Sequence, residues 1–433
     1  MTINELKKYK KILIIGYGVE GKATHAFLKK HFPEAIIDVV DASDGEDYLE
    51  DQQDYELAIK SPGVRPELVT IPYTTATNIF FANAKGKTIG VTGTKGKSTT
   101  ATLIYEMLKK DKKEVYLGGN IGKPAIEVLD TLTDHSWTVL ELSSFQLQDI
   151  KYSPHIAVML MLTSEHLDYH PNVESYIEAK RNLLRFQKQT DFAVLNRDYP
   201  VTNESDLYTD AQLFYVSRER ETNNACYTLS GAIYVKKNET EDEIIATKDV
   251  ALPGAHNLEN VCAAIMAARL AEVSTKYIIE VLKTFYGLPH RLEYVGEKQG
   301  IRFYNDSLAT VPEATIGALD AFAGEVETLI AGGHDRGVDY NELGQYLVTS
   351  GVRTTILFPT TGEKIWEAIV TAGGEKKIKK LDVHSMHEAI VYALDETNSG
   401  KICLLSPAAP SFGVFKNYKD RGDQFKKEVM GLA

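Results

Sequence analysis

Short apolar runs alternate with longer segments of helical periodicity along most of the chain. The runs are bounded by glycine, proline or polar residues, so each is predicted to be a buried strand. The predicted strands lie at residues 11–15, 36–40, 57–59, 89–91, 115–117, 137–142, 157–162, 192–195, 232–236, 302–304, 327–331, 355–358 and 401–405. One predicted helix ends near Lys30, and others lie at residues 99–109, 173–188, 257–271 and 312–321. This regular alternation predicts an α/β fold with mostly parallel sheets.

Two breaks in the alternation divide the chain into three predicted domains. The stretch 83–87 is short, polar and turn-rich, and Gly287-Leu288-Pro289 interrupts the pattern a second time. Glycine and proline in such short stretches are typical of boundaries between structural segments. We therefore predict domains at residues 1–84, 85–287 and 288–433, and a chain of 433 residues is long enough to give each its own core.

The charge and the cysteines narrow the function classes. With 48 basic and 60 acidic residues the net charge is −12, which argues against a general nucleic-acid binder. The longest apolar run covers residues 156–162 and is far too short to span a membrane, and the polar N-terminus does not resemble a signal peptide. Cys226, Cys262 and Cys403 are scattered and lack metal-ligand spacing, so we expect a reduced, cytoplasmic protein.

The most informative stretch of the sequence is a glycine turn between a predicted strand and a predicted helix. Residues 93–98 read Gly-Thr-Lys-Gly-Lys-Ser, directly after the apolar run 89–91. Free backbone N–H groups and the helix dipole at such a turn favour a phosphate group. Lys97 can reach the β- and γ-phosphates of a nucleotide, and the Ser98 hydroxyl can hold Mg²⁺. The usual first glycine of this motif is replaced by Val91, so the loop is shorter than usual.

A second glycine motif follows the first predicted strand. Residues 16–21 read Gly-Tyr-Gly-Val-Glu-Gly, and the acidic Asp41 ends the next strand. This spacing is typical of a dinucleotide fold and fits NAD, FAD or another nucleotide diphosphate. The turn Ser61-Pro62-Gly63 ends the third strand, where a ligand of an α/β sheet can bind.

Further candidate residues gain meaning once the phosphate loop is recognised. Glu141 ends a predicted strand and is placed to hold Mg²⁺ near the loop. His166 lies in a polar loop after the strand at 157–162. Tyr176 and Lys180 are four residues apart and therefore share one helix face.

Taken together, these motifs resemble the Mur ligase family, and within it the glutamate-adding group. The similarity runs nearly end to end, and the motifs occur in the same order. Those that carry it are residues 93–98, 141–147, 166–168 with 176–180, 254–260, 289–291, 305–307, 332–337, 406–408 and 421–422.

The resemblance implies three domains: an N-terminal Rossmann-like domain, a central P-loop ATPase and a C-terminal Rossmann-like domain. It implies that ATP phosphorylates the L-alanine carboxylate of UDP-N-acetylmuramoyl-L-alanine, after which the amine of glutamate attacks the acyl phosphate. Charge builds on phosphoryl oxygens, so such a reaction depends on cations and positioning. The cofactors expected are ATP and Mg²⁺, the partners are small molecules, and we expect a monomer.

The resemblance also implies roles for individual residues. Catalytic roles fall to Lys97, Lys180, His166 and Glu141, and metal binding to Ser98, Glu141, His166 and Lys180 as a carbamate. An ammonium group cannot bind a cation, whereas a lysine carbamate is a hard oxygen donor suited to Mg²⁺. The implied ATP-binding residues are Gly93, Thr94, Lys95, Gly96, Lys97, Ser98, Thr99, Asn257, Asn260, Arg291 and Asp306. The implied UDP-substrate residues are Gly18, Val19, Asp41, Ser61, Pro62, Gly63, Asn120 and His166, and the glutamate residues are Thr310, Arg336, Ser411 and Tyr418.

The chain departs from the usual family pattern mainly around the implied amino-acid pocket. Leu308 and Val311 replace a lysine and an asparagine, and Arg336 replaces a lysine while keeping its charge. Glu165 replaces an aspartate before His166. A smaller branch of the family adds L-glutamate and shares such variants, so both isomers stay open, with D-glutamate expected.

Three other function classes provide alternatives. Residues 16–21 alone would fit an NAD-dependent oxidoreductase, which leaves Lys97 and Glu141 unexplained. A folylpolyglutamate synthase-like ligase shares the ATPase and C-terminal domains, but generally lacks a nucleotide domain before the phosphate loop. A non-catalytic nucleotide-binding module would tolerate the loss of Lys180, whereas a ligase would not.

Overall fold

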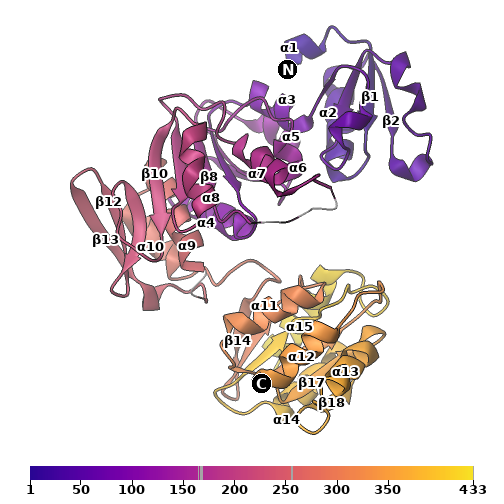
Figure 1. The fold of residues 1–433 in the computed structure, drawn as a ribbon, viewed down its shortest axis with the longest axis vertical. Helices are drawn as coiled ribbons and strands as arrows, with labels where there is room; N and C mark the ends of the chain where they lie inside the picture. The colour runs from indigo at the N-terminus through magenta and orange to yellow at the C-terminus, as the bar shows by residue number, and fades with distance from the viewer. Residues whose placement is uncertain (164, 166–168, 255–256, 433) are drawn as a thin grey trace. The chain divides into compact units, whose positions relative to one another are not determined.

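Three β-sheets flanked by helices organise the chain (Figure 1). The computed structural model describes residues 1–163, 165, 169–254 and 257–432. Contacts group the first two sheets into one unit, which runs from Met1 to Ala251 and includes the segment that ends at Phe285. The third sheet belongs to a second unit, which begins with a short segment at Leu252 and continues from Tyr286 onwards.

The first sheet has four parallel strands with a core of aliphatic side chains. Its order is β2 (Ile36–Val40), β1 (Lys11–Ile15), β3 (Leu57–Lys60) and β4 (Tyr73–Thr74). Residues 12–15 of β1 are fully buried because helices and loops cover both faces of the sheet, as is usual for parallel strands. Helix α2 (Val19–His31) packs on β1 and begins directly beyond its carboxyl end.

The second sheet is the largest, and the phosphate loop follows β5, one of its inner strands. Its order is β13 (Thr240–Ala246), β12 (Ala232–Lys237), β11 (Ala225–Leu229), β10 (Gln212–Ser217), β9 (Phe192–Asn196), β8 (Ile156–Met159), β5 (Lys87–Thr92), β7 (Trp137–Glu141) and β6 (Val115–Gly119). The strands from β11 to β6 are parallel, whereas β12 and β13 extend the edge as antiparallel hairpin strands. Strand β5 therefore has β7 and β8 as neighbours, and the carboxyl ends of all three meet at one edge.

The third sheet has six strands and forms the core of the second unit. Its order is β14 (Glu293–Lys298), β15 (Ile301–Asn305), β19 (Ile402–Leu405), β16 (Val326–Gly332), β17 (Thr354–Phe358) and β18 (Lys379–Asp382). Only β14 is antiparallel to its neighbour. Two buried clusters of aliphatic and aromatic side chains fill the two sides of this sheet.

The helices connect successive strands and cover the sheets. Besides α2 they are α1 (Ile3–Leu6), α3 (Ala76–Asn83), α4 (Lys97–Lys110), α5 (Ala125–Val128), α6 (Ser144–Leu147), α7 (Val173–Arg181), α8 (Pro200–Asn203), α9 (Asn257–Leu270), α10 (Thr275–Leu282), α11 (Pro312–Ala321), α12 (Asn341–Thr349), α13 (Thr361–Thr371), α14 (Met386–Glu396) and α15 (Tyr418–Met430). Short 3₁₀ helices lie at Ala42–Asp44, Glu50–Asp54, Pro66–Leu68, Leu129–Thr131, Glu204–Tyr208 and Thr247–Asp249. Throughout the described part of the chain, every helix is too short or too polar to cross a membrane.

The predicted α/β class with mostly parallel sheets is confirmed, and two predicted elements extend three or more residues too far. The helix predicted at 173–188 ends at Arg181. Leu183 and Leu184 continue its apolar pattern, but they are buried in the turn that follows the helix. The strand predicted at 157–162 ends at Met159, although Leu160 and Leu162 beyond it are also buried. The predicted domain limits at 84/85 and 287/288 stay predictions.

The close contact between α2 and the loop after β1 gives a test of this fold. A methyl group on Gly21 would lie 2.1 Å from the Gly16 carbonyl oxygen, whereas one on Gly18 would meet no atom within 4 Å. We expect Gly21→Ala to lower the free energy of unfolding by about 1–3 kcal/mol, the usual cost of overpacking. Gly18→Ala is the matched control and should cost less than about 1 kcal/mol as a change at a helix N-cap. Equal losses in urea denaturation would contradict this packing.

Candidate active site

The phosphate loop leaves β5 and enters α4 through two glycines with positive φ. Gly96 has φ +85° and caps α4, and a Cβ there would lie 2.1 Å from the Asn260 side-chain oxygen. Gly93 has φ +157°, and a Cβ there would lie 2.7 Å from the Leu160 Cβ. Both positions therefore require glycine for conformation and for space. The predicted strand–turn–helix is confirmed, and the N–H groups of the first turn of α4, at Lys97, Ser98 and Thr99, face the loop.

Two lysine amines donate to the same carbonyl oxygen inside this loop. The Lys97 Nζ lies 3.0 Å from the Gly93 oxygen, and the Lys180 Nζ lies 2.9 Å from it. Lys97 also donates to the Thr94 carbonyl oxygen at 2.8 Å. Lys180 comes from α7 and is 1% exposed. Two positive charges at one oxygen repel each other, so the arrangement favours a bound anion.

Burial and the neighbouring charge shift the titration of Lys180. Removal from water and the positive charge of Lys97 lower the pKa of Lys180 from 10.5 to about 7. The amine also lies over the ring of Tyr176, 4.8 Å from its centroid. A neutral amine is nucleophilic and can react with carbon dioxide, which an ammonium group cannot do.

Glu141 provides a carboxylate at the edge where the phosphate loop begins. It ends β7 opposite Val91 of β5 and is 1% exposed. Asn120 donates a hydrogen bond of 2.7 Å to its Oε1. Its Oε2 is buried and has no hydrogen-bond partner among the described residues. A buried carboxylate oxygen without a donor is suited to bind a cation.

The donors near the loop fit Mg²⁺ by chemistry. Ser98 offers a hydroxyl in the first turn of α4, and Glu141 offers the unpaired carboxylate oxygen. Within the described ranges, no three His, Cys, Asp or Glu side chains gather to hold a metal ion. A serine hydroxyl together with one carboxylate oxygen suits a cation that keeps several waters. His166, also predicted as a ligand, lies outside the described residues.

Tyr176 ties α7 to the phosphate loop. Its hydroxyl donates to the Thr94 Oγ1 at 3.1 Å and lies 3.5 Å from the Glu165 carboxylate. Thr94 in turn donates from its backbone to the Met161 carbonyl oxygen and accepts from the Thr163 N–H. These bonds fix the loop against the segment that follows β8.

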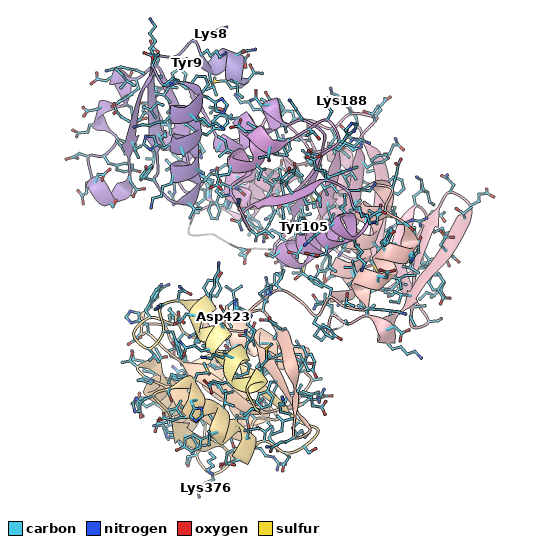
Figure 2. All side chains as sticks on the ribbon, turned by 180° about the vertical axis from the view of Figure 1, so that it is seen from behind. Lys8, Tyr9, Tyr105, Lys188, Lys376 and Asp423 are labelled. Atoms are coloured by element: carbon cyan, nitrogen blue, oxygen red, sulfur yellow. The ribbon has the colours of Figure 1, made fainter. Side chains whose placement is uncertain are left out.

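Two predicted ATP-binding residues lie on α9, against α4. The Asn260 Nδ2 donates to the Asn257 Oδ1 at 3.0 Å, and the Thr100 hydroxyl lies 3.4 Å from the Asn260 Oδ1. Both asparagines are buried. Figure 2 draws the side chains on the ribbon, with Tyr105 marking α4. The structure thus places Asn260 against the phosphate loop, with Asn257 beside it, and sequence analysis assigned the loop and both asparagines to ATP. Lys95, a further predicted ATP-binding residue, lies on this loop.

A pocket of about 510 Å³ opens at the carboxyl ends of the strands in the first sheet. Six of the eight residues predicted for the UDP-substrate line it, namely Gly18, Val19, Asp41, Ser61, Pro62 and Gly63. Gly16, Glu20 and Gly21 of the predicted glycine motif line it as well, whereas sequence analysis missed Ala42, Tyr48, Val64, Arg65 and Leu68. Asn120 lies instead beside Glu141 in the second sheet.

The charges that line this pocket have distinct roles. Asp41 accepts from the Tyr17 N–H at 2.6 Å and from Ser43, and these hydrogen bonds lower the pKa of its carboxyl. Burial raises the pKa of Glu20, which accepts a 3.0 Å bond from the Gln146 amide. Arg65 is the only cationic residue among those that line the pocket. An anionic ligand would meet Arg65 and the N-terminus of α2.

The second unit has a fully buried arginine that joins three strand ends. The Arg421 guanidinium donates to the Ser307 carbonyl oxygen at 2.9 Å, to the Ala409 oxygen at 3.1 Å and to the Gly332 oxygen at 3.5 Å. Ser307 follows β15, Ala409 follows β19, and Gly332 is the last residue of β16. Burial lowers the pKa of Arg421 to about 9, while the nearby Asp306 favours its charged form. Sequence analysis noted Arg421 only as part of a motif.

Asp306 is buried beneath the same loops. It accepts from the Ser406 hydroxyl at 2.8 Å and from the Leu292 N–H at 3.2 Å. Burial raises its pKa to about 7, against the attraction of Arg291 and Arg421. Asp306 and Arg291 lie in the second unit, whereas the phosphate loop lies in the first. Their contact with ATP therefore stays a prediction.

The four residues predicted to bind glutamate follow strand ends of the second unit. Thr310 lies between β15 and α11, Arg336 follows β16, and Ser411 follows β19. Tyr418 begins α15, and its carbonyl oxygen accepts from the Ser307 hydroxyl at 2.8 Å. Arg336 lies over the ring of Phe412, at 5.9 Å from its centroid, a contact that sequence analysis missed.

Comparisons with known families match most of the chain. The Mur ligase middle domain family matches residues 91–268, and the family described as Mur ligase, glutamate ligase domain matches residues 290–409. The UDP-N-acetylmuramoylalanine--D-glutamate ligase of Geobacillus kaustophilus (strain HTA426) is 41% identical over 387 residues, covering 87% of this chain and 84% of that protein. The enzyme of the same name from Acetivibrio thermocellus is 36% identical, covering 90% and 85%.

Solved structures share the fold at lower identity. The MurF ligase of Thermotoga maritima in complex with ADP has a TM-score of 0.57 and 19% identity, covering 98% of this chain and 95% of its own. The UDP-N-acetylmuramate-alanine ligase MurC of the same organism has a TM-score of 0.59 and 17% identity, covering 97% and 99%. At 17–19% sequence identity, these two structures show that the chain shares their fold.

The raised pKa of Asp306 predicts how the stability of the second unit depends on pH. Its pKa in the folded state, about 7, exceeds the ordinary 3.8, so the folded state binds the proton more tightly. This contribution to stability is fully present below pH 3.8 and is lost as the pH rises to about 7. Asp306→Asn should flatten that part of the profile. Urea unfolding followed by Trp366, on α13, in a Trp137→Phe background reports this unit. Parallel profiles with and without Asp306 would contradict the prediction.

Proposed function

The chain belongs to the Mur ligase family, and we propose that it is an ATP-dependent ligase that adds D-glutamate to UDP-N-acetylmuramoyl-L-alanine, a step of peptidoglycan precursor synthesis. The observation that carries this proposal is the pair of lysine amines at the Gly93 carbonyl, beside the unpaired oxygen of Glu141. The relatives that span most of the chain are named for the same reaction. We propose a cytoplasmic monomer with small-molecule partners.

The reaction needs an activated carboxyl group. An oxygen of the substrate's L-alanine carboxylate attacks the γ-phosphorus of ATP, the bond to the β-γ bridging oxygen breaks, and ADP leaves. The neutral amine of glutamate then adds to the carbonyl carbon of the acyl phosphate. The tetrahedral intermediate loses inorganic phosphate and a proton, and an amide remains. Phosphoryl transfer of this kind depends on positioning and on stabilising negative charge.

The residues at the phosphate loop supply that stabilisation. Lys97 and the backbone N–H groups of residues 93–99 would hold the ATP phosphates. Ser98 and Glu141 would hold one Mg²⁺, while His166 and a carbamylated Lys180 would hold a second. Mg²⁺ bound there would neutralise charge on the phosphate oxygens. In the carbamate, the Lys180 nitrogen bonds to the carbon of carbon dioxide and releases one proton.

The remaining predicted residues would bind the other parts of the three substrates. The pocket of the first sheet would take the nucleotide diphosphate, with Arg65 and the N-terminus of α2 facing the phosphates. Asn257, Asn260, Arg291 and Asp306 would contact ATP. Thr310, Arg336, Ser411 and Tyr418 would contact glutamate, with the Arg336 guanidinium suited to bind a carboxylate in bidentate fashion.

Phosphate release tests the proposed reaction. With Mg²⁺, ATP and UDP-N-acetylmuramoyl-L-alanine, we expect release of inorganic phosphate when D-glutamate is added, and a much slower rate with L-glutamate. A faster rate with L-glutamate would assign the chain to the L-glutamate-adding branch. Absence of phosphate release and of ADP with both isomers would refute the ligase.

Lys180 gives a sharper test, because the proposal needs its carbamate. Lys180→Ala should fold and lose ligation by about 100-fold or more, since even weaker perturbations of metal sites cost about 10- to 100-fold. Acetate should restore part of the rate by supplying a carboxylate in the vacated space. Lys188→Ala removes an exposed lysine beyond α7 and serves as the matched control (Figure 2). Full activity of Lys180→Ala would exclude the carbamate.

A further inference from the structure

Tyr169 is hydrogen-bonded to the turn that lines the nucleotide pocket, although Tyr169 itself does not line the pocket. Pro62, Val64 and Arg65 line the pocket on the turn after β3. The Tyr169 hydroxyl lies 3.1 Å from the Val64 carbonyl oxygen and 3.3 Å from that of Pro62, so its single proton is shared between them. The Gln148 amide donates to the same hydroxyl at 2.6 Å. The hydroxyl thus has an acceptor and a donor partner at once.

A lysine amine donates to the same carbonyl group of Val64. Lys60, at the end of β3, donates to the Val64 oxygen at 2.8 Å and forms a buried ion pair of 2.8 Å with Asp149. Tyr73 donates to the other oxygen of Asp149. A carbonyl oxygen has two lone pairs, and the Val64 oxygen has a donor for each in Lys60 and Tyr169. The orientation of the peptide between Val64 and Arg65 is therefore fixed.

The ring of Tyr169 contacts the pocket's only cation. The Arg65 guanidinium lies over this ring, 5.6 Å from its centroid, in the geometry of a cation–π contact. The ring itself packs edge-on against Phe145 at 4.5 Å and His170 at 5.2 Å. Phe145 and Gln148 belong to α6 and its C-terminal end, which follow Glu141 in the chain. Tyr169 thereby connects the pocket rim with the segment next to the phosphate loop.

We propose that Tyr169 is a positioning residue for the nucleotide-sugar substrate. Its hydroxyl holds the Val64 carbonyl and its ring face holds the Arg65 guanidinium, so that this cation meets the diphosphate without reorganisation. The inference rests on the proposed function, because that function supplies a nucleotide diphosphate as the ligand of the pocket. Tyr169 acts through Arg65 and does not itself touch the reacting atoms.

Binding of UDP to the full-length protein, measured by calorimetry without ATP, tests this role. Tyr169→Phe keeps the ring and removes the hydroxyl, and should weaken UDP binding about 5-fold, the effect of one hydrogen bond. Tyr169→Leu also removes the ring face and should weaken it further, by about 10-fold or more. The Kd for an ATP analogue and the kcat at saturating substrates should stay within about 2-fold, while the KM for the UDP-substrate rises.

Tyr55→Phe is the matched control. Tyr55 precedes β3 and donates to the carboxylate of Asp38 on β2 at 2.9 Å, and neither residue lines the pocket. Its loss should leave UDP binding unchanged, which separates a general effect of removing a tyrosine hydroxyl from an effect on the pocket.

A double-mutant cycle distinguishes positioning from a merely structural role. If Tyr169 acts through Arg65, the effect of Tyr169→Leu on UDP binding should largely vanish in an Arg65→Met background. Additive effects, or unchanged UDP affinity in both Tyr169 variants, would overturn the inference and leave the ligase proposal intact. Failure of the wild-type protein to bind UDP and the UDP-substrate would overturn both.

Discussion

Two lysine amines at one buried carbonyl oxygen are the constraint on which the phosphate loop depends. Lys97 and Lys180 reach the Gly93 oxygen from α4 and α7, so both helices must begin or pass at the end of β5. The carboxylates of Glu165 and Glu141 favour the charged form of Lys180, but burial and the charge of Lys97 outweigh them, so an anion that binds there would reduce the repulsion between the two amines. A phosphate group, or a carboxylate formed on Lys180, would be such an anion. The loop is therefore arranged for its ligands before they bind.

Strand order explains why distant sequence motifs meet at this point. Strand β5 lies between β7 and β8, so the loop after β5, the Glu141 end of β7 and the segment after β8 share one edge of the sheet. The first sheet repeats the rule, with pocket residues after β1, β2 and β3. In the second unit, Arg421 fixes the segments beyond β15, β16 and β19. Ligands of open parallel sheets bind beyond the carboxyl ends of strands for this topological reason.

Features that depend on local pattern could be predicted from the sequence. Residues 11–15, 36–40 and 312–321 have the bounds that the sequence predicts, and Pro312 opens the last of these in the first helical turn, where proline is favoured. Glycine spacing located the phosphate loop and most of one pocket wall. The helix at 173–188 was predicted too long, since Leu183 and Leu184 are buried by tertiary contacts that no periodicity distinguishes from a helix. Tyr169, Arg65 and Arg421 act through partners that are far away in sequence, and only the fold brings those partners together.

The pocket of the first sheet, the phosphate loop and the strand ends of the second unit share one kind of contact. Lys60, Lys97, Lys180 and Arg421 each donate to backbone carbonyl oxygens just beyond a strand end. A carbonyl dipole satisfies the hydrogen-bonding capacity of a buried cation without cancelling its net charge, unlike a carboxylate. Lys60 also forms an ion pair with the Asp149 carboxylate at 2.8 Å. The chain as a whole carries a net charge of −12, yet each of these cationic groups lies at a strand end. Because a nucleotide diphosphate, ATP and glutamate are all anions, the same arrangement would serve each of the proposed substrates.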